Sequence, residues 1–176
     1  MNHAAGNLVR MALGKDYVRQ DCSLARALEV VGERWTLLIV RDALYGVRRF
    51  GHFLAHLEIP RAVLSARLQA LVEAGVLEKR GGDYVITDTG RDLWPVVHAL
   101  ARWGDRNYSD QGPCRLFLHI PCGKRIDADG ACPACGRVVP LEELEMHPGP
   151  GLDPARDDPI SVALRTPHRL LEPIAV

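Results

Sequence analysis

Two short helical segments joined by a very short connection constrain the fold of this chain more than any other feature. Apolar side chains recur every three or four residues in both segments, at Phe50, Phe53, Leu54 and Leu57 and then at Leu64, Leu68 and Leu71. That spacing places each set on one face of an α-helix. Glu58 and Ile59 form the turn between the helices, and Pro60 stands where the first turn of a helix tolerates proline. The pattern predicts a helix-turn-helix.

The segments on either side extend this pair into a larger domain. We predict a helix over 23–31 capped at Cys22, a helix between Gly32 and Gly46, strands at 76–79 and 84–86 around a tight turn at 80–83, and a long final helix capped by Thr87. Helices, hairpin and helix in this order predict a winged helix. The expected fold class is therefore mainly α-helical with a small β-hairpin.

Composition divides the chain into three parts. Of the 176 residues, 47% are hydrophobic and 25% charged, which is typical of a globular protein. We expect the winged helix to occupy residues 18–110 and a small zinc-ribbon-like segment to occupy 111–146, where cysteines cluster. Residues 147–176 hold half of the prolines, which cannot sustain a long helix or a central strand. We expect this last part to be a Pro-rich extended tail.

Charge and hydropathy restrict the partners and the location. Lys plus Arg equal Asp plus Glu at 22 each, so the whole chain does not attract polyanions, and any such contact must be local. From Arg48 to Arg67 there are four arginines and two histidines against the single acid Glu58. No apolar run is long enough to cross a bilayer, and residues 1–18 lack a signal-peptide core. We expect a cytoplasmic protein without a membrane partner.

The second helix of the pair has the chemistry to enter the major groove of double-stranded DNA. With its leucines facing inward, its outer side presents arginine, which reads guanine through two parallel hydrogen bonds. Basic residues just before and at the start of the first helix of the pair, and at the tip of the hairpin, are placed to contact phosphates. The predicted DNA-binding residues are Arg48, Arg49, His52, Arg61, Ala62, Ser65, Arg67, Lys79 and Arg80.

Ordered motifs in this region resemble the HxlR family of bacterial winged-helix transcription regulators. They are Cys22-(x12)-Trp35-Thr-Leu-Leu-Ile-Val-Arg-Asp-Ala-Leu44, Gly46-(x2)-Arg49-Phe50, Leu64-Ser-Ala-Arg-Leu-Gln-Ala-Leu71-(x3)-Gly75-Val-Leu-Glu78, Tyr84-(x2)-Thr87-(x2)-Gly90 and Trp103-Gly104. The resemblance covers roughly residues 18–106. It implies a homodimer joined through the N-terminal segment and the last long helix. Two recognition helices would then meet an inverted-repeat operator. The hairpin is shorter than is usual in the family, so phosphate contact is the expected role of its tip.

The resemblance also implies a sensing role for one cysteine. In several HxlR-type regulators the residue matching Cys22 senses quinones, aldehydes or oxidants, and a helix N-terminus stabilises a thiolate. Arg19 and Arg26 lie nearby in sequence, whereas Asp21 opposes a thiolate. The alternative is an inert capping or buried cysteine. Regulation by a small-molecule effector or a redox signal is therefore an open expectation.

A second motif has the spacing of a four-ligand metal site. His119-(x2)-Cys122-(x9)-Cys132-(x2)-Cys135 contains two knuckles, and a glycine follows the second ligand of each. Three thiolates and one imidazole would complete the coordination of Zn²⁺, so the ion would be structural rather than catalytic. Three alternatives remain: Cys114 in place of His119, a redox dithiol formed by Cys132 and Cys135, and a metal-free segment.

Enzyme function has no support in the sequence. The chain contains no Gly-rich phosphate loop, no nucleophile-elbow serine and no paired catalytic carboxylates. We therefore predict a sequence-specific DNA-binding regulator rather than an enzyme. The alternative is a zinc-stabilised protein-interaction module without specific DNA binding, in which the arginines are merely solvated.

Overall fold

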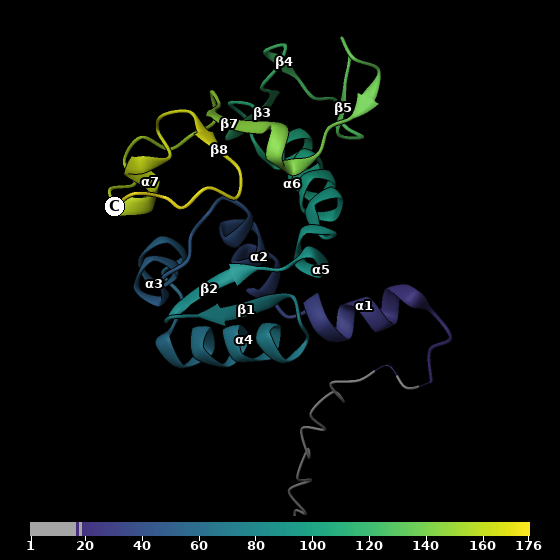
Figure 1. Cartoon of the computed structure of the whole chain (residues 1–176), viewed down its shortest axis with the longest axis vertical. Helices are drawn as coiled ribbons and strands as arrows, with labels where there is room; N and C mark the ends of the chain where they lie inside the picture. Colours follow the sequence, from purple (N-terminus) through teal and green to yellow (C-terminus); the bar gives the residue numbers. More distant parts are fainter. Residues whose placement is uncertain (1–16, 18) are drawn as a thin grey trace, which may run out of the picture.

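Helices and one β-hairpin form the first half of the described chain (Figure 1). The computed structural model describes Tyr17 and residues 19–176. The predicted start of the winged helix at residue 18 therefore lies outside the described residues. So do residues 1–16 of the segment predicted to lack a signal-peptide core. The elements are α1 (Ser23–Val31), α2 (Thr36–Leu44), α3 (Phe50–Leu57), α4 (Arg61–Glu73), β1 (Leu77–Arg80) and β2 (Asp83–Ile86). β1 pairs antiparallel with β2. The predicted helix-turn-helix with its wing is confirmed.

The last helix of this half is interrupted, so the prediction of one long helix from Thr87 is wrong. The Thr87 hydroxyl accepts a hydrogen bond from the Gly90 amide at 3.1 Å and caps only a short helix, α5 (Asp88–Arg91). The longer α6 (Trp94–Tyr108) then begins with Pro95 in its first turn. Proline lacks the amide hydrogen that would bond Arg91, and its ring clashes with that carbonyl, so the helix restarts here.

The second half of the molecule is rich in short strands. β3 (Arg115–His119), β4 (Lys124–Arg125), β7 (Leu144–Pro148) and β8 (His168–Arg169) form an antiparallel sheet in the order β4-β3-β7-β8. A separate hairpin, β5 (Ala131–Cys132) with β6 (Arg137–Val138), carries the second knuckle. The 3₁₀ helix η1 (Leu141–Glu143) leads into β7.

Residues 147–176 are not a free extended tail. β7 crosses the expected boundary at 146, and β8 pairs with it, so the second and third predicted segments share one sheet. The short helix α7 (Pro159–Ala163) contacts α3. Ile160, Leu164 and Leu170 are at most 2% exposed. The prolines do prevent long regular elements, but these apolar side chains between them bury enough surface to dock the segment.

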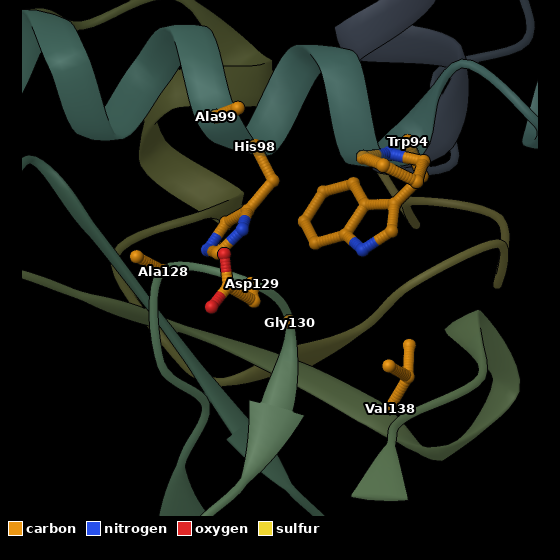
Figure 2. A pocket seen from close by; sticks show the side chains of 8 residues that line it. Trp94, His98, Ala99, Ala128, Asp129, Gly130 and Val138 are labelled. Carbon is orange, nitrogen blue, oxygen red and sulfur yellow. The ribbon is translucent and has the colours of Figure 1, made fainter.

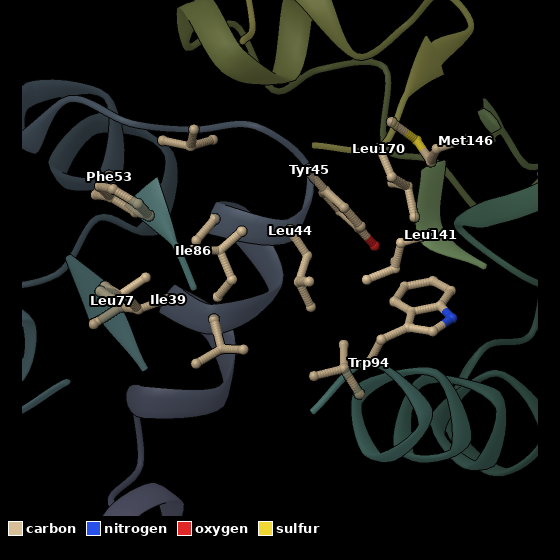
Figure 3. Close-up of a cluster of buried hydrophobic side chains, with 14 of the residues drawn as sticks. Ile39, Leu44, Tyr45, Phe53, Leu77, Ile86, Trp94, Leu141, Met146 and Leu170 are labelled. Carbon is tan, nitrogen blue, oxygen red and sulfur yellow. The ribbon is translucent and has the colours of Figure 1, made fainter. Parts of the chain in front are cut away.

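One hydrophobic core joins the two halves (Figure 3). Phe53 and Leu77 bury their side chains on the helix-turn-helix side, and Leu141 and Met146 do so on the strand-rich side. Tyr45 lies between them, with its ring centroid 6.1 Å from that of Phe117. The cysteine-rich part is therefore packed on the winged helix rather than tethered to it. In the described part of the chain, every helix is too short or too polar to cross a membrane.

Candidate DNA-binding surface and metal centre

The recognition helix α4 is fixed on one side and free on the other. Leu64, Leu68 and Leu71 are at most 1% exposed and pack into the core, whereas Arg61, Ala62 and Ser65 are exposed. Glu58 ends α3 with a left-handed backbone at φ 49°, which turns the chain toward α4. In Figure 1, α4 lies at the outer edge of the molecule, on the far side of the hairpin from the strand-rich half. A surface placed in this way can approach a duplex without rearrangement.

Two arginines of α4 occupy different flanks of that surface. Arg61 and Arg67 are each three residues from Leu64 in opposite directions, and so lie about 60° to either side of the buried stripe. The Arg61 guanidinium stacks over the Phe50 ring, 5.3 Å from its centroid. Arg67 instead forms an ion pair with Glu33 at 3.0 Å and is only 26% exposed. Arg61 is therefore the better placed of the two for DNA.

The residues before α3 form a second basic region beside the C-terminus. Arg49 is exposed at the N-cap of α3, and His52 is half-buried within that helix. The Arg48 guanidinium donates a hydrogen bond to the Leu171 carbonyl at 3.3 Å. All three line a depression of about 260 Å³ together with Asp83 and residues 173–176. The C-terminal residues 173–176 therefore occupy part of the region predicted to contact phosphates.

The wing is attached directly to this basic region. The Tyr84 amide donates to the Arg48 carbonyl at 2.8 Å, which ties β2 to the loop before α3. Lys79 is exposed with its ammonium 5.6 Å from the centroid of the Tyr84 ring, and Arg80 is paired with Glu78 at the tip. Both cations remain on the surface, as a phosphate contact requires.

The four predicted metal ligands converge at one point. His119, Cys122, Cys132 and Cys135 place their ligand atoms within 4.8 Å of one another, so the group can hold a metal ion. The Cys122 Sγ lies 3.3 Å from the Cys132 Sγ and 3.9 Å from the Cys135 Sγ. The His119 Nδ1 lies 3.1 Å from the Cys122 Sγ and 3.5 Å from that of Cys135. Around a tetrahedral zinc ion these separations would be about 3.8 Å between sulfurs and about 3.6 Å between nitrogen and sulfur, so the group fits zinc.

A carboxylate on η1 orients the His119 ring. The His119 Nε2 lies 2.8 Å from a carboxylate oxygen of Glu143, which leaves Nδ1 for the metal. Arg137 pairs with the same carboxylate. The hydrogen bond to Glu143 raises the pKa of His119, and in turn the hydrogen bonds from His119 and Arg137 lower the pKa of Glu143. Such a carboxylate–histidine pair is typical of metal centres.

The remaining cysteines lie away from this group. Cys114 is exposed, and its thiol donates to the Gly151 carbonyl at 3.1 Å, so His119 and not Cys114 faces the three thiols. Cys22 is exposed at the N-cap of α1, where its side chain makes no capping hydrogen bond.

Two further clusters were not predicted. His56 lies between Asp42 and Asp158, and His98 faces a small cavity beside Asp129. In both cases the partners are distant in sequence, so no local spacing could have found them.

Comparisons with known proteins agree with the geometry of α3 and α4. Residues 30–112 match a family model described as an HxlR-like helix-turn-helix. Over 137 residues, 73% of this chain and 87% of the relative, the sequence is 42% identical to an HTH-type transcriptional regulator of Mycobacterium tuberculosis, Rv3095. The chain belongs to the HxlR family.

More distant relatives of this HxlR protein carry the same description. An HTH-type transcriptional regulator of Bacillus subtilis, YdeP, is 27% identical over 110 residues, 56% of this chain and 85% of the relative. A crystal structure described as a candidate transcription factor, PA1607, is 34% identical, covers 71% of this chain and 93% of its own, and has a TM-score of 0.57. Membership of HxlR confirms the prediction of a transcriptional regulator rather than an enzyme.

Proposed function

We propose that this HxlR protein is a homodimeric regulator that binds an inverted-repeat DNA operator through α4. The observation that carries the proposal is the arrangement of α4, whose leucines anchor it while Arg61, Ala62 and Ser65 stay free. Arg61 would read a base edge in the major groove. Arg49, His52 and Lys79 would supply phosphate contacts, joined by Arg80 and, where the C-terminal residues 171–176 leave it accessible, Arg48. Such a regulator works in the cytoplasm, where the bacterial chromosome lies.

Exposed apolar side chains on α1 and α6 support the homodimer. Leu24 on α1 is 65% exposed, and Leu100 and Trp103 on α6 are 50% and 48% exposed. Large apolar side chains concentrated on two helices mark an association surface. Leu100→Lys should convert the dimer to a monomer in sedimentation-velocity experiments and abolish operator binding.

We also propose that His119, Cys122, Cys132 and Cys135 hold a structural Zn²⁺. The distances between the ligand atoms and the hydrogen bond from His119 to the Glu143 carboxylate support this assignment. With four protein ligands the ion would have no open position, so it would stabilise β5, β6 and their connection to β3 without taking part in chemistry. Because this region has a small core, metal binding would supply much of its folding energy.

Selection from a random DNA library followed by gel shift tests the DNA-binding proposal. The expected result is a symmetric motif whose half-site centres are separated by about 10 base pairs or a multiple of that spacing. Binding should survive excess non-specific competitor DNA. Binding that is abolished by competitor and enriches no motif would contradict the proposal and favour a protein-interaction module. Cys22→Ser tests the sensing role, because DNA release by oxidants or quinones should disappear in that variant if Cys22 is the sensor.

A further inference from the structure

A cavity of about 250 Å³ lies between α6 and the hairpin that carries Cys132 and Cys135 (Figure 2). Trp94, Pro95, His98 and Ala99 line it from α6, and Ala128, Asp129, Gly130 and Val138 line it from the segment around the hairpin. The volume is slightly below the range of about 300–1,000 Å³ that holds drug-sized molecules, so it suits a smaller ligand.

The α6 side of the cavity is a rigid aromatic wall. Trp94 and His98 are 6% and 4% exposed and stack with their ring centroids 5.3 Å apart. Phe117 on β3 packs edge-on against both, at 4.8 Å from Trp94 and 5.7 Å from His98. The rings are therefore held in place before any ligand arrives, which lowers the entropy cost of binding a flat molecule.

His98 and Asp129 each offer a hydrogen-bond acceptor to the cavity. Within the described part of the chain, the His98 side chain forms no hydrogen bond to another residue. Its ring nitrogens are not among the fully buried polar atoms that lack a partner, so a ligand in the cavity can reach them. Burial, followed by Arg102 and Arg125, lowers the pKa of His98, so its imidazole is neutral and has a free acceptor nitrogen. Asp129 lines the same cavity and brings a carboxylate to it (Figure 2).

We propose that this cavity binds a small hydroxylated aromatic molecule. Its ring would lie against Trp94 and His98, and its hydroxyl would donate to the imidazole nitrogen or to the Asp129 carboxylate. A hydroxyl is favoured over a carboxylic acid because Asp129 is the one charged residue among the described residues that line the cavity, and an anion would be repelled by its carboxylate.

The location of the cavity gives the ligand a route to the DNA-binding surface. Val96 and Leu100 lie about 200° around α6 from Trp94 and His98, so they occupy the opposite face. That face is the association surface of the proposed dimer, and this step therefore rests on the proposed function. A ligand that shifts α6 would change the separation of the two recognition helices.

Binding is tested first without DNA. The zinc-loaded full chain is titrated with 2-naphthol while NMR follows the ring protons of His98 and the indole N–H of Trp94, with naphthalene as the probe that lacks the hydroxyl. We expect saturable shifts at both residues with 2-naphthol and at least about tenfold weaker binding of naphthalene, the difference made by a charge-assisted hydrogen bond. Equal affinity for the two probes, or no saturable shift, would overturn the proposal.

Two variants localise the binding. Ala99→Phe, at an exposed position on α6, should fill the cavity and abolish the shifts without disturbing the core. Asp129→Asn should weaken 2-naphthol about tenfold, whereas Asp157→Asn, at an exposed position elsewhere, should not. Unchanged binding in Ala99→Phe would place the probe elsewhere and overturn the proposal.

The link to regulation has a separate readout. In gel shifts, 2-naphthol should change the operator affinity of the wild-type protein but not that of Ala99→Phe. Binding of the probe with no change in operator affinity would overturn the regulatory role. Failure of the protein to bind any operator would instead contradict the proposed function and leave the ligand titration to decide the site.

Discussion

The Nδ1 atom of His56 lies 3.1 Å from a carboxylate oxygen of Asp158, although 102 residues separate them in the chain. On its other side, the His56 Nε2 lies 3.7 Å from a carboxylate oxygen of Asp42, which is fully buried and paired with Arg41 at 2.7 Å. The Ser161 hydroxyl lies 3.3 Å from the His56 Nδ1. His56 therefore connects α2, α3 and α7, and it fastens the C-terminal segment to the helix-turn-helix.

Replacement of Asp158 should release this connection in a pH-dependent way. Burial alone would raise the pKa of Asp158, but hydrogen bonds from Ser161 and His56 outweigh it and lower the pKa from 3.8 to about 2. Because the folded pKa lies below the unfolded one, the carboxylate stabilises the fold above about pH 4, and this contribution disappears as the pH falls toward 2. Asp158→Ala should lower the free energy of unfolding by about 1–2 kcal/mol at pH 7, the cost of a lost helix cap.

Urea denaturation of wild type and Asp158→Ala from pH 7 to pH 3 measures this effect. The difference between the two should shrink below about pH 4. Asp157→Ala, an exposed neighbour, serves as the control and should match wild type at every pH. A difference that stays constant across the range would contradict the assignment to the Asp158 charge.

The sequence predicted those parts of the structure whose signals are local. The periodic leucines identified α4, and two x2 spacings identified the four residues whose ligand atoms converge, His119, Cys122, Cys132 and Cys135. The interactions with Asp158 and Glu143 could not be predicted, because His56 and His119 meet them only through tertiary packing. The packing of residues 147–176 on the rest of the molecule was not predicted for a similar reason. The prolines indicated an extended tail, and the buried Ile160 and Leu170 show no helical or strand periodicity. The break before α6 could have been inferred from Pro95 alone.

Loss of one thiolate should remove the metal and loosen the hairpin. Wild type should contain one zinc ion per chain by mass spectrometry under metal-free buffer conditions, and Cys135→Ser should contain none. Cys114→Ser is the matched control and should retain the ion, because its thiol bonds Gly151 instead. Glu143→Gln should keep the ligands but weaken zinc binding about 10–100-fold, since it alters the partner of His119. Loss of zinc from Cys114→Ser as well as from Cys135→Ser would contradict the proposed ligand set.

Arg61 and Arg67 should differ in their effects on DNA binding. Arg61→Ala should cost about 1–3 kcal/mol in operator affinity and relax specificity at one base pair. Arg67→Ala should cost less operator affinity, because Arg67 is engaged with Glu33. Loss of this surface ion pair should change the free energy of unfolding by only about 0–1 kcal/mol. Titrations on the selected operator and on a scrambled duplex provide the comparison. If Arg61→Ala weakens both duplexes equally, Arg61 contacts only phosphate.

Gly46 allows the C-terminal segment, residues 171–176, to pass close to the helix-turn-helix. Its φ is +96°, and a Cβ at this position would overlap the Glu172 carbonyl oxygen. The neighbouring Ile174 amide donates to the Gly46 carbonyl at 3.2 Å. Gly46→Ala should therefore strain the backbone, displace residues 171–176 and lower the free energy of unfolding by at least about 1 kcal/mol.

Carboxypeptidase digestion and urea denaturation test this displacement. In Gly46→Ala the C-terminal residues should be removed faster than in wild type. Gly51→Ala is the control, because a Cβ at Gly51 within α3 meets nothing within 4 Å and alanine favours helix. Displacement also frees the Arg48 guanidinium from the Leu171 carbonyl, so the salt dependence of DNA binding should steepen by about one phosphate contact in Gly46→Ala. An unchanged digestion rate would mean that residues 171–176 are not held through Gly46.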